Sequence, residues 1–263
     1  MTGKVPALSM IFMAVSGVIS FGLPILLLVW LKVRKKADMA AFFIGCLIML
    51  VFAFILESSV RRVVLTSPAG ERILSNTVLY AVYGGLMAGF FEETGRLFAF
   101  KAFFGNKRNK NVNAIMYGAG HGGFEAIVLL GLTSINNLTW SILINSGNTK
   151  AITGSLTGDA LSQAQAAISS LTTTAPLLFL MGGLERIFAI VLHIALSLLV
   201  WTAVKRPGRF YLFPAAILIH ALVDGVTVIF SNAGMPVPVL EAVIGLMSLL
   251  TLIYAKKEWK QLG

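Results

Sequence analysis

The sequence predicts an all-α integral membrane protein, a polytopic bundle of about seven transmembrane helices. Hydrophobic residues make up 57% of the 263 residues and charged residues only 12%, which excludes an ordinary water-soluble domain. An apolar run of about 18 or more residues is long enough to cross the hydrocarbon core as a helix. With no internal repeat or linker, residues 1–263 are predicted to form one domain. The apolar runs cover residues 8–31, 39–57, 76–104, 113–132, 176–203, 210–231 and 236–255.

The first run is predicted to stay attached as a helix, although it stands where a signal peptide would. Its apolar core is too long for a signal peptide, and the basic residues 32–36 follow it rather than precede it. Basic clusters also occur at 107–110, 205–209 and 256–260, in every second connection. Because short cytoplasmic connections carry an excess of Lys and Arg, we expect the N-terminus outside and the C-terminus in the cytoplasm. The arginines of the 58–75 connection weaken this pattern without reversing it.

The charge, the single cysteine and the loop composition limit the possible partners and cross-links of the chain. The net charge is +10, but most of the cations lie beside apolar segments, where they contact lipid headgroups, so no nucleic acid partner is expected. A lone cysteine, Cys46, excludes an intrachain disulfide framework. The long 133–175 connection is rich in Ser, Thr, Asn and Gln, and residues 159–172 are predicted to form a helix over the outer face. The expected location is a bacterial plasma membrane, crossed several times.

All three histidines lie inside apolar runs, together with several acidic residues. A charge at the centre of a membrane helix costs roughly 2.5 to 3.5 kcal/mol on insertion scales, so such residues commonly mark a pathway or a reaction site. With a rise of 1.5 Å per residue, His121, His193, His220 and the Glu92-Glu93 pair lie about 12 to 17 Å from the expected cytoplasmic ends of their helices. Four helices are therefore predicted to place polar groups in one layer.

The third run contains Glu92 and Glu93, with Arg96 one helical turn later. One carboxylate can pair with Arg96, while the other points about 100° away and can take a proton from water. A buried ion pair that only fixes helix packing is the structural alternative.

Two of the other runs pair a histidine with an acid. Tyr117, His121 and Glu125 lie on one helical face, so Glu125 is predicted to orient the imidazole of His121. His220 and Asp224 form a second pair four residues apart.

His193 lies two turns after Arg186, on the same helix face. Glu185 and Arg186 belong to the outer part of that helix. They are predicted mainly to neutralise one another.

These motifs resemble those of a glutamic-type superfamily of intramembrane proteases, which includes CAAX prenyl proteases, bacteriocin-processing enzymes and PrsW-like proteases. The sequence is most similar to the YhfC-type membrane peptidases. The superfamily has a double glutamate followed by a base, then an aromatic residue four before a histidine, then His-x-x-x-Asn/Asp. Here the arginine stands one residue closer than in the CAAX branch and a tyrosine replaces the usual phenylalanine, so CAAX substrates are not implied. The matching segments are Glu92-Glu93-x-x-Arg96, Tyr117-x-x-x-His121 and His220-x-x-x-Asp224.

The resemblance implies hydrolysis of peptide bonds in a membrane-associated protein or peptide, without a cofactor. Glu92 would activate water, His121 would position it, and His220 with Asp224 would stabilise the developing oxyanion. His193 could either take part in the reaction or hold the catalytic side chains in place.

Three classes of alternative remain open. The imidazoles of His121, His193 and His220 could instead hold zinc. The buried ionisable residues could form a proton or ion relay in a transporter. The chain could also be a non-catalytic membrane partner protein.

Overall fold

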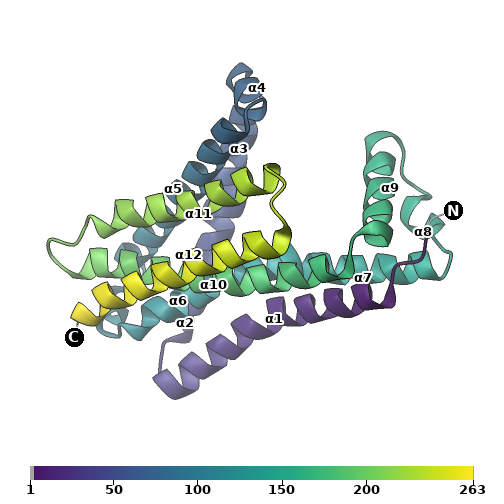
Figure 1. Ribbon diagram of the computed structural model, residues 1–263. Helices are drawn as coiled ribbons and strands as arrows, with labels where there is room; N and C mark the ends of the chain where they lie inside the picture. The colour runs from purple at the N-terminus through teal and green to yellow at the C-terminus, as the bar shows by residue number, and fades with distance from the viewer. Residues whose placement is uncertain (1–2, 263) are drawn as a thin grey trace. The chain divides into compact units, whose positions relative to one another are not determined.

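The structure is all-helical, as the sequence predicts (Figure 1). The computed structural model describes residues 3–262, and these contain no β-strand. The α-helices are α1 (Ala7–Lys35), α2 (Met39–Ile48), α3 (Ser58–Leu65), α4 (Pro68–Leu74), α5 (Thr77–Ala102), α6 (Val112–Ala126), α7 (Leu132–Asn145), α8 (Lys150–Thr153), α9 (Gly158–Thr173), α10 (Pro176–Lys205), α11 (Leu212–Asn232) and α12 (Val237–Trp259). The other helical segments are the π-helices η1 (Met49–Glu57) and η3 (Ile127–Gly131) and the 3₁₀ turns η2 (Gly105–Asn109) and η4 (Lys260–Leu262).

The number of membrane spans agrees with the prediction. Within the described residues, six helices are long and apolar enough to cross a membrane, and α4 with α5, bent by 111°, supplies a seventh. The predicted run 76–104 corresponds to α5, which is less apolar because it carries Glu92, Glu93 and Arg96. The direction in which the chain crosses the membrane stays a prediction.

Two predicted helix ends are wrong. The helix expected to end at residue 57 continues through α3 to Leu65. The helix expected to end at residue 132 continues through η3 and α7 to Asn145. Its polar residues are accommodated because the hydroxyls of Thr133, Thr139 and Ser141 donate to backbone carbonyls four residues earlier, at 2.6 to 2.9 Å. The helix predicted over 159–172 is confirmed as α9.

The chain divides into two compact units. The first comprises residues 3–22 and 126–186, and its apolar core includes Met13, Ile144 and Ile168. Asn145 fixes the chain start in this unit, because its side chain bonds both the N–H and the carbonyl of Val5 at 2.8 and 3.0 Å. The second unit comprises residues 23–125 and 187–262. That residues 1–263 form one domain stays a prediction.

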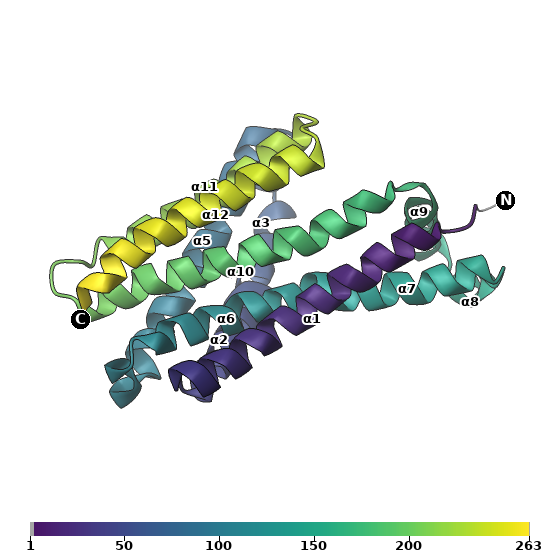
Figure 2. The same cartoon turned by 60° about the horizontal axis from the view of Figure 1, so that its bottom comes forward.

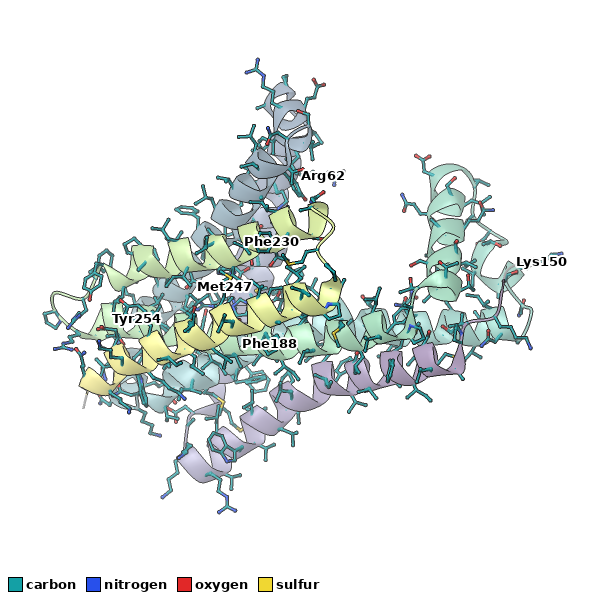
Figure 3. The ribbon with its side chains drawn as sticks, in the orientation of Figure 1. Arg62, Lys150, Phe188, Phe230, Met247 and Tyr254 are labelled. Atoms are coloured by element: carbon teal, nitrogen blue, oxygen red, sulfur yellow. The ribbon has the colours of Figure 1, made fainter. Side chains whose placement is uncertain are left out.

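The second unit has an aromatic core. The ring of Phe100 contacts Tyr117 and Trp201 edge-on, with centroid distances of 4.7 and 4.9 Å. In this unit α11 and α12 lie side by side (Figures 1 and 2). Phe188, Phe230 and Met247, from α10, α11 and α12, pack against the same core and are labelled in Figure 3.

Two glycines bring α5 against α11. A Cβ added to Gly85 would collide with the backbone carbonyl of Ala221, and one added to Gly89 would lie 2.5 Å from the carbonyl oxygen of Ile217. The numbering rises on one helix as it falls on the other, so the helices are antiparallel. Only glycine permits such a close approach of two backbones. The approach brings side chains of α5 and α11 within reach of one another.

Candidate active site

Three buried side chains from three helices meet at one point in the second unit. Glu92 lies in α5, His121 in α6 and His193 in α10, and one possible ligand atom of each lies within 4.8 Å of the others. Glu92 Oε2 is 3.0 Å from His121 Nε2 and 3.8 Å from His193 Nδ1. Their exposed fractions are only 6%, 0% and 3%. We call these three residues the donor group.

The outer ring nitrogens of both histidines have partners on α6. His193 Nε2 is 2.7 Å from Glu125 Oε2, and His121 Nδ1 is 3.5 Å from the Tyr117 hydroxyl oxygen. A carboxylate accepts a hydrogen bond, so Nε2 of neutral His193 carries the hydrogen and Nδ1 carries the lone pair, which accepts from a terminal nitrogen of Arg96.

The prediction that Glu125 orients His121 is therefore wrong, because its carboxylate binds the imidazole of the neighbouring helix. The reason is the close approach of α10 at Gly122, where an added Cβ would lie 2.9 Å from Cδ2 of His193.

The two adjacent glutamates have different surroundings. Arg96 donates to both carboxylate oxygens of Glu93, and its second terminal nitrogen lies 3.2 Å from His193 Nδ1. His220 Nδ1 lies 2.9 Å from Glu93 Oε1. Glu93 is thus held by two cationic or polar partners, whereas Glu92 faces the two histidines. Glu93 is therefore the glutamate that pairs with Arg96, and the reactive role of Glu92 stays a prediction.

His220 lies beside the donor group without belonging to it. Its ring centroid is 5.5 Å from that of His193, but Nδ1 is directed at Glu93. Nε2 is 3.7 Å from Asp224 Oδ2, which is too long for a hydrogen bond. The geometry therefore assembles two imidazoles and one carboxylate, rather than the three imidazoles and one carboxylate of the predicted zinc alternative.

Glu185 and Arg186 lie in the first unit and contact each other. Arg186 Nε donates to Glu185 Oε2 at 3.1 Å, and a second bond joins the other nitrogen and oxygen. This is the mutual neutralisation that the sequence predicts for them.

The sequence prediction missed two buried acids. Glu57, at the end of η1, is 4% exposed, pairs with Arg61, and has electrostatic interactions with His220 and Asp224. In the sequence, Glu57 could have been found as an acid that stands four residues before a base at the border of an apolar run. Glu241 is 6% exposed within α12, where an acid inside the seventh apolar run was the signal.

Comparisons with known proteins agree with this site. A family model described as "YhfC intramembrane metalloprotease" matches residues 19–245. The "Uncharacterized membrane protein YhfC" of Bacillus subtilis (strain 168) is 36% identical over 254 residues, which cover 95% of this chain and 97% of that protein. No solved structure matches the chain.

These similarities confirm the predicted resemblance to YhfC-type peptidases and the multi-pass membrane location. The family description names a metal-dependent protease, so the predicted absence of a cofactor is not supported, and the zinc alternative gains weight. The match spans most of the chain and includes every helix that contributes to the donor group. The chain belongs to the YhfC intramembrane metalloprotease family.

Proposed function

We propose that this chain is an intramembrane peptidase that hydrolyses peptide bonds of a membrane-associated protein or peptide at the donor group. The observation that supports this most is the meeting of Glu92, His121 and His193 within 4.8 Å, from three helices and away from the surface. Ionisable groups in such a position are costly, and they are typical of reaction sites and ion pathways. The description of the family favours the reaction site.

The donor group fits a zinc ion. Two imidazoles and one carboxylate are a common ligand set of catalytic zinc sites, whose tetrahedral bonds of about 2.0–2.1 Å place donor atoms roughly 3.4 Å apart. The separations of 3.0 and 3.8 Å at Glu92 Oε2 lie on either side of that value. The Glu125 carboxylate on the far nitrogen of His193 is a usual partner of a metal-bound histidine.

We therefore propose that Glu92, His121 and His193 hold zinc. Zinc at such a site lowers the pKa of a water molecule to near 7 and polarises the scissile carbonyl. Glu125 keeps the Nδ1 lone pair of His193 directed inward, where an ion would replace the hydrogen bond from Arg96. Tyr117 would do the same for His121 by accepting from its Nδ1–H.

Proton transfer is assigned to the chain's own carboxylate. With Oε2 directed at the histidines to hold the ion, the other carboxylate oxygen of Glu92, Oε1, would accept the proton that the attacking water gives up and pass it to the leaving amine nitrogen as the C–N bond breaks. The Nδ1–H of His220 donates to Glu93, so Nε2 would donate to the carbonyl oxygen from the imidazolium form, whose positive charge faces the carboxylates of Glu93 and Asp224. Arg96 keeps Glu93 in the position that holds His220.

A comparison of membrane peptides tests the proposed function without knowledge of the substrate. Cells expressing the wild type or His121→Ala would be profiled by mass spectrometry of new peptide termini in the membrane fraction. We expect fragments of membrane proteins that appear only with the wild type, because His121 is a ligand in the donor group. Glu241→Gln, a matched change at a buried acid outside the group, should leave these fragments in place. Identical profiles for wild type and His121→Ala would contradict the proposal.

A further inference from the structure

The donor group is buried, yet the proposed hydrolysis consumes water, so water must reach it from one side. Toward α11, the charged side chains beside the group are almost fully enclosed, with exposed fractions of 0% for Glu93 and Arg96 and 3% for His220, whereas the Glu125 side chain against His193 is 15% exposed. Beyond His220 this changes, because the side chain of Asp224 is 39% exposed. The more exposed end of the charged network therefore lies beyond His220, on the side of Asp224.

Residues from three segments gather at that end. Gly85 of α5 lies against Ala221 of α11, and a Cβ added to Gly225 of α11 would lie 3.5 Å from the carbonyl oxygen of Ala81 of α5. Tyr83 and Asp224 therefore lie at about the same level along the two helices. Glu57 of η1 interacts electrostatically with Asp224, and Tyr83 interacts with Glu57 and Arg61.

We propose that Glu57, Arg61, Tyr83 and Asp224 line the aqueous entrance through which water reaches the donor group, at the end of the second unit where α5 begins. The role of this entrance in hydrolysis rests on the proposed peptidase function, whereas its contact with water does not. We call these four residues the entrance.

Exposure of charge inside membrane spans is the first argument. Arg61 and Asp224 belong to the spans Met39–Leu65 and Leu212–Asn232, yet their side chains are 41% and 39% exposed. Ionised side chains at such positions face a water-filled cavity rather than hydrocarbon, because contact with lipid is too costly.

Buried polar atoms without a protein partner are the second argument. Among the described residues, the Tyr83 hydroxyl and Arg61 Nε are buried and have no hydrogen-bond partner. Polar groups of this kind are commonly satisfied by ordered water. Glu57 closes the π-helical segment η1, and π-helical distortions occur often at functional sites.

The other face of the α5–α11 pair provides an internal contrast. It carries a shallow apolar groove of about 270 Å³, and Val82 and Leu222 are among the residues that line it. These two side chains are 51% and 58% exposed, more than Asp224, but they line an apolar groove and not the charged network, so we expect them to face lipid. Exposure alone therefore does not separate the two faces, so the test must measure contact with water.

Modification of single cysteines in nanodiscs tests the entrance. Cys46 would first be replaced by Ala, and cysteines then introduced as two matched pairs, Asp224→Cys with Leu222→Cys and Tyr83→Cys with Val82→Cys. A small charged methanethiosulfonate reagent reacts with the thiolate, which forms in water but not in hydrocarbon. Nanodiscs expose both membrane faces, so the direction of insertion does not affect the result.

We expect the entrance cysteine to react about tenfold faster or more than its lipid-facing partner in each pair, because only the former ionises readily. Circular dichroism and gel filtration would confirm that each variant folds. If Asp224→Cys does not fold, the rates of Tyr83→Cys and Val82→Cys test the entrance. Equal rates within the folded pairs would overturn the entrance. That result would leave the peptidase function standing, and loss of peptidase function would leave the labelling rates unchanged.

Discussion

Replacing Glu92 with Gln is expected to lower kcat/KM for cleavage of a membrane peptide by about a thousandfold, within the range for loss of a general acid-base group. Glutamine has nearly the same shape, but it neither carries the negative charge that faces His121 and His193 nor accepts the proton from water. The measurement is the initial rate in proteoliposomes, with a peptide spanning a cleavage site found in cells.

Glu241→Gln is the matched control, because Glu241 has the same exposed fraction of 6% and lies outside the donor group. It is expected to cleave at the wild-type rate. A Glu92→Gln rate within tenfold of the wild type would exclude Glu92 as the water-activating carboxylate, whatever the metal content of the protein.

Replacing Arg96 with Gln is expected to lower the free energy of unfolding by about 3 to 5 kcal/mol, the usual cost of breaking a buried ion pair from one side. Arg96 and Glu93 are both fully buried, so the Glu93 carboxylate would lose its cationic partner without gaining water. Unfolding by SDS in mixed micelles, followed by circular dichroism, measures the change.

The double variant Glu93→Gln with Arg96→Gln separates an ion pair from loss of packing. It removes both charges, and we expect it to recover most of the lost free energy of unfolding. A double variant as unstable as Arg96→Gln alone would show that the guanidinium stabilises the fold by its volume rather than by its charge.

The sequence predicts best what depends on one helix. Spacings of three and four residues correctly place Arg96 beside one of the two adjacent glutamates and put Tyr117 beside His121. The depth of each ionisable residue is also a property of one helix, and the predicted layer agrees with the ring contacts between His121, His193 and His220.

Contacts between helices are less predictable, because they depend on how each helix is rotated and how closely it packs. Glu125 reaches His193 rather than His121 where Gly122 admits α10, and Glu93 meets His220 where two glycines join α5 to α11. The residue spacing within a single helix does not predict these pairings. Glu57 was missed because it stands where an apolar run meets a connection, and its role depends on neighbours from α5 and α11.

The most direct test of the donor group is the metal content of the purified protein and its histidine variants, measured by inductively coupled plasma mass spectrometry. We expect about one zinc ion per chain in the wild type and in His220→Ala, and little in His121→Ala or His193→Ala, because only the latter two histidines belong to the donor group. Loss of zinc in His220→Ala equal to that in the other two would contradict this assignment and favour three imidazole ligands. A wild type that cleaves peptides without metal would contradict the zinc centre itself.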